Sequence, residues 1–508
     1  MSDLTSSNLT LSSVTRRNLL KGIAAAPLVF GFARNARAAT SLRCDLSTPG
    51  GLDMLATYAN GLRAMQAMTP DNPSSWMWQW YTHFVDGATD KTNEVARVWG
   101  ETLTPQRTLA EEVWNTCQSH AGQSSNNFLP WHRYYVWMLE RIIRTVTGRV
   151  DFAMPYWNYT SADPAQRGVV PLQFRMPDDP VFGVLYRPNR VARANNGLPI
   201  HALQPGDAMN IDEAMSKTNY STVGSVTGFG RTLDSTIHGR IHTLVGNTRG
   251  MGAVPYAGND PLFFVHHCNI DRMWASWNKN GNKNPTDAVA NPWINNAFVM
   301  ADERGLRSTR SIKNLFSALQ LGYDYDAFFP RPPVAPTTPP PATLAAKAVS
   351  GAQKVASAVN MVNLGAAPTT VKLARLANAR ATDMLGLDTS DARRTFLVLR
   401  KLHAWKQPGV LYHVYLCASP TAGTDAANYV GNINFFDAEF HEHGGGSKLD
   451  TALGENFYSF DVTALLSGMA KRPRASTTRE MLFVKIVPGG KPETGADAMV
   501  AQVDLVRQ

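Results

Sequence analysis

The clearest pattern of apolar and polar positions lies between residues 259 and 277. Asn259-Asp260-Pro261 supplies a capping carboxylate followed by a proline, which predicts that a helix begins there. The positions that share one face of this helix are Phe263, His267, Ile270, Trp274 and Trp277. His267 therefore lies within the buried stripe, and His266 lies off it. Asp271, one turn after His267, is expected to accept the free ring N–H of that histidine.

Other histidines fall on predicted helices or next to them. His238-Gly-Arg-Ile-His242 holds two imidazoles one helical turn apart, a spacing at which one helix offers two ligands to a metal. A helix is also expected over residues 128–141, with His132 on its apolar face. His120 precedes that helix in a loop rich in Gly, Ser and Asn, and His83 ends a Trp-rich segment of helical spacing. The chain thus offers two groups of three imidazoles.

The residue types alone leave the metal open. Six neutral nitrogen ligands without an obligatory thiolate or carboxylate suit Zn, Cu, Fe or Ni. One three-histidine site would favour a hydrolytic zinc, whereas two such sites in an aromatic shell favour two copper ions that share one dioxygen. Histidines that stand alone are by default hydrogen-bonded structural residues, as we expect for His201, His403 and His413. We expect His441 and His443 to be solvated.

The pattern changes after residue 327. Residues 328–341 are rich in proline and predict a stiff extended linker, and the Ala-rich stretch that follows has few large apolar residues, which favours a connector. From about Arg394, short β-branched and aromatic runs bounded by Gly, Pro and Asn predict antiparallel strands. The expected parts are a mainly α catalytic domain at 39–327, a linker at 328–393 and a small β-sandwich at 394–508.

Residues 1–38 have the pattern of an export signal. They contain the twin arginine Arg16-Arg17, a short apolar run and the small-residue cleavage pattern Ala36-Arg37-Ala38. Such a leader passes folded proteins to the twin-arginine (Tat) export machinery, so we expect a periplasmic or secreted protein. No other apolar stretch approaches the ~20 residues that span a bilayer, so no membrane span is expected in the mature chain.

The charge and the cysteines exclude other classes. The formal net charge is +9, but residues 1–38 hold five basic residues against one acidic residue. The remaining charge is spread without a dense basic run, so nucleic-acid binding is not expected. Four cysteines are too few and too scattered for a disulfide framework in a chain of 508 residues. Cys268 is expected to be a small core residue.

Three segments resemble the copper signatures of the tyrosinase and polyphenol oxidase family. They are Phe128-Leu-Pro-Trp-His-Arg-Tyr-Tyr, His238-Gly-Arg-Ile-His and Asn259-Asp-Pro-Leu-Phe-Phe-Val-His-His-Cys-Asn-Ile-Asp-Arg-Met-Trp. The resemblance implies a helical bundle around a type-3 copper pair, with one copper on His83, His120 and His132 and the other on His238, His242 and His267. It also implies oxidation of o-diphenols to o-quinones with dioxygen, as in a tyrosinase or catechol oxidase, with monophenol hydroxylation as the further activity of a tyrosinase.

A weaker resemblance continues past the linker. Residues 429–436, 460–466 and 482–492 are similar to the C-terminal domain of plant-type polyphenol oxidases, which implies a domain that covers the copper site. An oxygen carrier is the alternative, because molluscan haemocyanin also combines such a copper domain with a β-sandwich. A single exported unit without repeated domains argues against it. A zinc hydrolase or a binding module is a third candidate.

The chain departs from the family pattern at several positions. His120 and His132 are twelve residues apart, whereas the family usually has nine, which implies an insertion in the loop. Cys117 either forms a thioether with His120 or is a free buried thiol. Asp234 stands one turn before His238, where plant-type relatives have a glutamate, and is expected to help deprotonate a monophenol. The alternative is that Asp234 caps the helix. Gly239 offers no side-chain amide to orient a water there.

Overall fold

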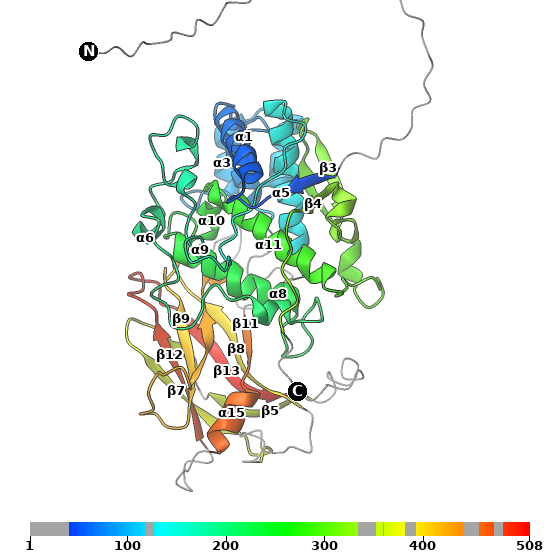
Figure 1. The fold of residues 1–508 in the computed structure, drawn as a ribbon. Coiled ribbons are helices and arrows are strands. Elements are labelled where there is room, and N and C mark those ends of the chain that lie inside the picture. The colour runs from blue at the N-terminus through cyan, green and yellow to red at the C-terminus, as the bar shows by residue number, and fades with distance from the viewer. Residues whose placement is uncertain are drawn as a thin grey trace, which may run out of the picture. The chain divides into compact units, whose positions relative to one another are not determined.

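The computed structural model describes residues 40–117, 126–333, 352–358, 360–380, 393–439, 457–471 and 481–508. Figure 1 shows helices in the first part of this chain, here called the helical part, and mostly strands after residue 352, the C-terminal part. The helices are α1 (Pro49–Gln66), α2 (Trp76–His83), α3 (Lys91–Trp99), α4 (Pro105–Val113), α5 (Phe128–Thr147), α6 (Ala192–Asn195), α7 (Asp212–Met215), α8 (Phe229–Leu233), α9 (Gly239–Val245), α10 (Val254–Ala257), α11 (Leu262–Lys279) and α15 (Thr463–Ala470). Residues 40–508 form one compact unit.

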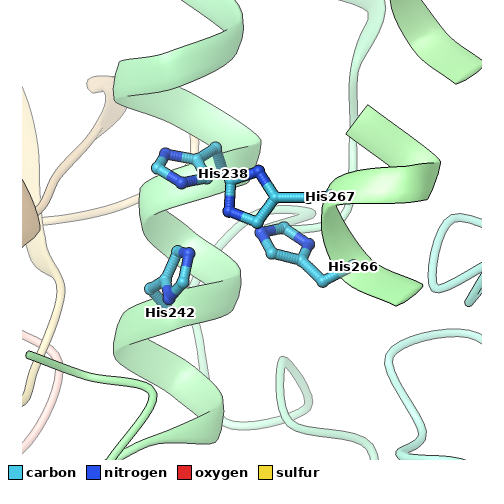
Figure 2. Close-up of side chains that lie close together, drawn as sticks. All are labelled: His238, His242, His266 and His267. Carbon is cyan, nitrogen blue, oxygen red and sulfur yellow. The ribbon is translucent and has the colours of Figure 1, made fainter. Parts of the chain in front are cut away.

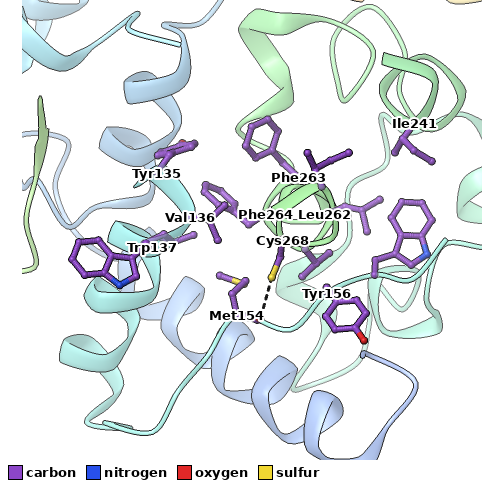
Figure 3. Packing of buried hydrophobic residues seen from close by; sticks show 14 of the residues in the cluster. Tyr135, Val136, Trp137, Met154, Tyr156, Ile241, Leu262, Phe263, Phe264 and Cys268 are labelled. Carbon is purple, nitrogen blue, oxygen red and sulfur yellow. Dashed lines mark hydrogen bonds between the residues drawn. The ribbon is translucent and has the colours of Figure 1, made fainter. Parts of the chain in front are cut away.

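Three long helices, α1, α5 and α11, form the centre of the helical part, and α5 packs against both of the others (Figure 1). Apolar side chains surround α5 and α11 almost completely, which is typical of helices buried in a core. Figure 3 shows Phe263 and Phe264 of α11 in this core, and the ring of Phe264 lies 5.1 Å from that of Tyr135 in α5. The predicted stripe of α11 is buried, but His266 is buried as well because this helix has neighbours on every side.

The predicted helices are found, with ends close to those expected. Helix α11 begins at Leu262, and the carboxylate of Asp260 accepts the N–H of Leu262 at 2.9 Å. The same carboxylate pairs with Arg190 at 2.6 Å, so it both caps the helix and anchors a loop. Helix α5 begins at Phe128, and α2 ends at His83.

One continuous helix runs from Phe229 to Val245 and contains a π-helical turn. It consists of α8, the π-turn at Asp234–His238 and α9. Such a turn adds one residue to the helix and occurs mostly at functional sites. Because the helix already begins at Phe229, Asp234 lies inside it. The alternative in which Asp234 caps this helix is therefore wrong.

Two small sheets hold the ends of the helical part. Strand β1 (Ser41–Arg43) pairs in parallel with β4 (Tyr323–Tyr325), and β2 (Ala297–Ala301) pairs antiparallel with β3 (Arg307–Ser311). The first of these sheets joins the start of the described chain to the segment just before residue 328.

The C-terminal part is one nine-stranded antiparallel sheet. Its strands are β5 (Gln353–Ala358), β6 (Val362–Asn363), β7 (Thr369–Arg375), β8 (Thr395–His403), β9 (Tyr412–Cys417), β10 (Tyr429–Ile433), β11 (Phe457–Asp461), β12 (Met481–Pro488) and β13 (Met499–Arg507). The order is β10-β9-β12-β7-β5-β13-β8-β11, with β6 beside β13. Strands β10 and β11 contact each other, so the sheet nearly closes on itself. An antiparallel C-terminal β domain is thus confirmed, built as one curved sheet.

The predicted start of the C-terminal domain at residue 394 is wrong. Strands β5, β6 and β7 lie before it, inside the segment expected to be a linker, and β5 and β7 occupy the middle of the sheet order. Val355, Ala356 and Leu373 are buried in the core of this sheet. Small residues favour a connector by composition, but they are accommodated here because neighbouring strands hydrogen-bond to both edges of β5 and of β7.

Some predictions concern residues outside the described ones. They are the export signal at 1–38, His120, the proline-rich residues 334–341, and His441 and His443. Among the described residues, no helix is long and apolar enough to cross a membrane.

Candidate metal centre

Four buried imidazoles converge between two helices (Figure 2). His238 ends the π-turn and His242 lies one turn later in α9, while α11 carries His266 and His267. One ring nitrogen of each lies within 4.8 Å of those of the other three. All four side chains are at most 1% exposed. The arrangement brings nitrogen ligands from both helices to one point, as a metal site requires.

Hydrogen bonds orient two of these rings. Nδ1 of His242 lies 2.7 Å from the backbone oxygen of Met251, and Nδ1 of His238 lies 3.3 Å from that of Asp234. A ring that donates from Nδ1 keeps a lone pair on Nε2 for a metal. Within the described chain, Nε2 of His242 and both ring nitrogens of His267 have no hydrogen-bond partner. An unpaired buried group costs about 1–3 kcal/mol, and coordination to a metal would remove that cost.

A second cluster joins His83 at the end of α2 with Cys117 and His132, again with ligand atoms within 4.8 Å of one another. His132 donates from Nδ1 to the backbone oxygen of Phe128 at 2.9 Å, and its Nε2 lies 3.5 Å from the sulfur of Cys117. The ring of His132 also stacks on that of His267, with centroids 4.1 Å apart. The two clusters are therefore in contact. The thioether expected between Cys117 and the loop histidine stays a prediction.

Burial keeps these imidazoles neutral. It lowers the pKa of His83 to about 3 and that of His238 to about 4. The pKa values of His132, His242 and His267 fall well below 6.5, first through burial and then through their imidazole neighbours. At neutral pH these rings are uncharged, which is the form that binds metals. Nitrogen ligands of this kind fit copper as well as zinc, iron or nickel.

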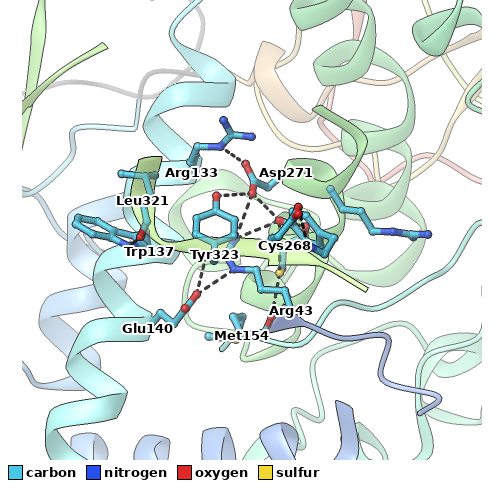
Figure 4. A network of polar contacts seen from close by, with 12 residues as sticks. Arg43, Arg133, Trp137, Glu140, Met154, Cys268, Asp271, Leu321 and Tyr323 are labelled. Atoms are coloured by element: carbon cyan, nitrogen blue, oxygen red, sulfur yellow. Dashed lines mark hydrogen bonds and ion pairs between the residues drawn. The ribbon is translucent and has the colours of Figure 1, made fainter. Parts of the chain in front are cut away.

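Asp271 does not act as predicted from its place one turn after His267. The groups that donate to its carboxylate are Arg43, Arg133, Tyr323 and Tyr325 (Figure 4). The predicted hydrogen bond with His267 is therefore wrong, because arginines and tyrosines from elsewhere in the chain already donate to both oxygens of this carboxylate. Burial acts to raise the pKa of Asp271, but Arg133 and Arg43 outweigh it, and the pKa is lowered.

Three neighbours of the histidine helices have structural roles. Glu140 pairs with Arg43 at 2.6 Å, and Arg272 donates to the backbone oxygen of Ala327 at 2.8 Å, so Glu140 and Arg272 brace the fold. Cys268 is buried in the core and donates to a backbone oxygen at 3.2 Å (Figure 3). No disulfide bond joins the four cysteines, all of which lie in the described part of the chain.

Asp234 lies next to His238, as the one-turn spacing predicts. Its Oδ1 is 2.9 Å from Nδ1 of His238, and its Oδ2 is 3.1 Å from Nη1 of Arg231. Burial raises the pKa of Asp234 to about 7, and Arg231 opposes that rise. The carboxylate thus contacts the nitrogen of His238 that is not the expected metal ligand.

The C-terminal part contributes an aromatic ring that the sequence analysis missed. Phe436, in the 3₁₀ turn η8 (Phe436–Ala438), stacks on His242 with centroids 4.0 Å apart and planes at 9°. It also meets the ring of His238 edge-on at 5.6 Å. Phe436 is 1% exposed and belongs to the hydrophobic core of the helical part. Phe436 ends the segment 429–436 that resembles plant-type polyphenol oxidases, but the sequence did not place it beside the histidines, because only the folded chain brings it there.

Two polar residues beside Phe436 also reach the histidine helix. Asn434 donates to the backbone oxygen of Ser235 at 2.8 Å, and Asp437 lies 3.4 Å from Arg231. A Cβ at Gly239 would lie only 2.4 Å from Oδ1 of Asn434. The absence of a side chain at Gly239 therefore lets the C-terminal part approach the helix this closely.

Comparison with known proteins shows which family the chain resembles. The family model described as the common central domain of tyrosinase matches residues 73–189 and 170–280, which contain all the predicted histidine ligands. Tyrosinase HcTyr1 of Hahella sp. is 28% identical over 483 residues, which cover 89% of this chain and 96% of that protein. Polyphenol oxidase C of Solanum lycopersicum is 29% identical over 239 residues, which cover 39% of this chain and 36% of that protein.

Solved structures share the fold over most of the chain. A latent aurone synthase (polyphenol oxidase) superposes with a TM-score of 0.59 at 20% identity, covering 93% of this chain and 90% of that one. Latent apple tyrosinase superposes with a TM-score of 0.57 at 18% identity, covering 93% and 98%. The helical core and the C-terminal sheet agree with these matches in fold. With the match to the central domain of tyrosinase and the similarity to tyrosinase HcTyr1, the chain belongs to the tyrosinase and polyphenol oxidase family.

Proposed function

We propose that the chain is a type-3 copper oxidase that converts o-diphenols to o-quinones with dioxygen and hydroxylates monophenols more slowly. The named relatives support a phenol-oxidising oxidoreductase with a copper centre. The observation that carries the proposal is the contact between two buried histidine clusters. In the cluster on α9 and α11, Nε2 of His242 and both ring nitrogens of His267 have no hydrogen-bond partner in the described chain. Bound copper would supply the electron transfer between the phenol and dioxygen.

We assign one copper to His83, His120 and His132 and the other to His238, His242 and His267. The choice of His267 over His266 is supported by the ring contacts of the two residues. His267 stacks on His132 at 4.1 Å, so it lies between the clusters. The ring of His266 lies 5.0 Å from that of His242, within its own cluster, and 5.4 Å from that of Tyr159.

The role of the protein is to keep these imidazoles neutral, to orient their rings and to exclude water from them. Backbone oxygens anchor Nδ1 of His132 and His242, which fixes the nitrogen that faces the metal. The ring of Phe263 packs 4.1 Å from that of His267, and such aromatic neighbours exclude bulk water. A phenol that enters would stack among these rings.

Asp234 is proposed to orient His238. Its Oδ1 lies 2.9 Å from Nδ1 of His238 but accepts no hydrogen bond in the described chain, whereas its Oδ2 accepts from Arg231. A carboxylate in this position can fix the tautomer of a ligand histidine and raise its basicity. The role predicted from the sequence, as the base for an incoming monophenol, would require Oδ1 to turn from His238 towards the substrate. The two roles predict different effects of Asp234→Asn, described below.

The C-terminal part is proposed to cover the copper pair. Phe436 stacks face to face on His242 and therefore occupies space that a phenol ring would need to reach that side of the site. This occupation agrees with the shielding role implied by the plant-type resemblance. Displacement of Phe436 would then be required before substrate reaches the metals.

Metal counting and paired substrates test the proposed reaction. The purified full-length protein is loaded with copper or with zinc, and its turnover of 4-tert-butylcatechol and 4-tert-butylphenol is compared. We expect about two coppers per chain, the number that two three-histidine sites would hold, and dioxygen uptake with the catechol only in the copper form. Reversible dioxygen binding without quinone formation would instead identify an oxygen carrier. Retention of zinc with hydrolytic activity would identify the third candidate.

Cover displacement is tested in the same full-length protein. Phe436→Ala should raise catechol turnover several-fold without a change in copper content, and so should cleavage between residues 334 and 345 followed by separation of the two parts. Phe435→Ala is the matched control, because Phe435 belongs to the core of the C-terminal sheet and not to the histidine site. Unchanged turnover after both treatments would rule out a shielding role.

We also propose that the chain is exported by the twin-arginine route to the periplasm or beyond. The support is the sequence pattern of Arg16-Arg17 followed by an apolar run. Replacing both arginines (Arg16→Lys and Arg17→Lys) should retain the protein in the cytoplasm. Equal amounts of exported protein from both forms, measured by fractionation, would contradict this route.

A further inference from the structure

A pocket of about 160 Å³ lies between the helical part and the C-terminal part, and no histidine of the two clusters lines it. Its polar lining comprises Asp207, Asn210, Glu213, Thr236 and Arg240 from the helical part and Tyr429 and Asn432 from the C-terminal part. One water needs roughly 10–15 Å³ on such a measure, so the pocket has room for a small organic molecule.

Arg240 is the buried end of this pocket and is only 7% exposed. Its Nε donates to Oδ1 of Asn432 at 2.9 Å, while its Nη1 reaches the backbone oxygen of Ala208 only at 3.5 Å. In the described part of the chain, no carboxylate lies within ion-pair distance of this guanidinium. Other buried arginines differ: Arg43 and Arg190 each pair with a carboxylate at 2.6 Å.

A buried guanidinium without a counter-charge is costly. An anionic group placed in the pocket would supply the missing counter-charge and a bidentate partner. The buried end of the pocket therefore favours a carboxylate.

The exposed end of the pocket carries negative charge, opposite to that of Arg240 at the buried end. The side chains of Asp207 and Glu213 are 45% and 42% exposed. Asp207 pairs closely with Arg167 at 2.5 Å, but Glu213 lies 3.7 Å from Lys217, a looser contact that leaves it able to meet another cation. A simple anion would meet these carboxylates on its way in, whereas a molecule with a cationic group next to its carboxylate would match both ends.

We propose that this pocket binds a small zwitterion of the α-amino acid class. The carboxylate of the ligand pairs with Arg240, and its ammonium group faces Glu213 and Asp207. The hydroxyl of Tyr429, which accepts from Asn432 at 3.3 Å, lies on the wall between them. Because α9 forms one side of the pocket and β10 the other, an occupant also strengthens the contact between the helical and C-terminal parts.

Calorimetric titration of the full-length, copper-loaded protein tests this site. L-Alanine is the probe because it has no phenol that could enter the copper site, and acetate and ethylammonium each carry one of its two charges. We expect L-alanine to bind at least about tenfold more tightly than either, since each charged contact adds to affinity. Failure of L-alanine to bind at roughly 50 mM, or equal binding of acetate, would overturn the proposal.

Two variants locate the binding. Glu213→Gln should weaken the binding of L-alanine by about tenfold and leave the affinity for acetate unchanged, because only the ammonium contact is lost. Arg240→Gln should weaken the binding of both ligands. Copper content and unfolding temperature are measured for each, since Arg240 sits between two histidines of the metal centre. Unchanged L-alanine affinity in folded, copper-loaded forms of both variants would place the binding elsewhere and refute the assignment.

Discussion

Two buried polar clusters share helix α11, and they differ in how their polar atoms are satisfied. Around Asp271, both carboxylate oxygens accept hydrogen bonds from arginine or tyrosine, and a second acid, Glu140, completes the charge balance. Around His267, ring nitrogens converge, and Nε2 of His242 and both nitrogens of His267 have no hydrogen-bond partner in the described chain. The first cluster is complete within the protein and braces it. The second needs a component that the chain does not supply, which is why burial alone does not distinguish a structural cluster from a functional one.

The largest expected effect comes from removing a nitrogen of the unsatisfied cluster. His242→Ala should lower bound copper from two to one per chain and catechol oxidation by about a thousandfold or more, equivalent to at least ~4 kcal/mol of activation free energy. The metal-free protein should change in stability by only about 1 kcal/mol, because the lost ring carried an unpaired nitrogen. Metal analysis, oxygen uptake and urea unfolding of both forms measure these three quantities.

His266→Ala is the matched control for His267→Ala, because the two rings are adjacent and equally buried. Only His267→Ala should lose a copper. If His266→Ala alone did so, the ligand assignment within this pair would be reversed.

The satisfied cluster should respond in the opposite way. Asp271→Asn leaves Arg43 and Arg133 without their full counter-charge and should destabilise the fold by about 3–5 kcal/mol. Copper per folded chain should stay the same, since Asp271 does not contact His267. The exposed Asp151→Asn serves as control and should leave the free energy of unfolding nearly unchanged. Loss of copper at unchanged stability would show that Asp271 supports the metal site after all.

The stabilisation by Asp271 should also depend on pH. Its folded-state pKa is lowered, so it stabilises the fold above its unfolded pKa of about 3.9. This contribution is lost as pH falls through the lower, folded-state value. The difference in unfolding free energy between the parent and Asp271→Asn should therefore be constant from about pH 6 to 5 and shrink below about pH 4. A constant difference down to acid unfolding would mean that the ion pairs contribute little.

The smallest effect is expected at Asp234, which stands at the edge of the unsatisfied cluster. If Asp234 orients His238, Asp234→Asn should lower catechol oxidation and monophenol hydroxylation together, by about tenfold. A fall in hydroxylation alone, measured against the catechol rate of the same preparation, would support the role as a base for the monophenol.

The sequence predicts those parts of the site that depend on local spacing. His238 and His242 share a helix, so a four-residue interval is enough to bring them together, and the stripe of α11 likewise places His267. Asp271 and Phe436 depend on long-range partners. Arg43 lies 228 residues from Asp271 in the sequence. The spacing of residues within α11 therefore cannot show that Arg43, and not His267, donates to this carboxylate.

The boundary of the C-terminal domain shows the same limit in the fold. Strands β5 and β7 have few large residues, and their place in the middle of the sheet comes from pairing with β13 and β12 far along the chain. Composition favours a connector in such a segment because the pairing that makes small residues suitable is not local. The later strands were predicted because their apolar runs are long enough to indicate burial by themselves.

Gly239 connects the evolution of the two parts of the chain. A side chain there and Asn434 in its present position would claim the same space, since a Cβ would come within 2.4 Å of the amide oxygen. Any descendant that acquires a larger residue next to His238 must at the same time move or shorten Asn434. A substitution at Gly239 therefore changes both the surroundings of His238 and how closely the C-terminal part packs on the helix. One position thus affects the metal site and its cover at the same time.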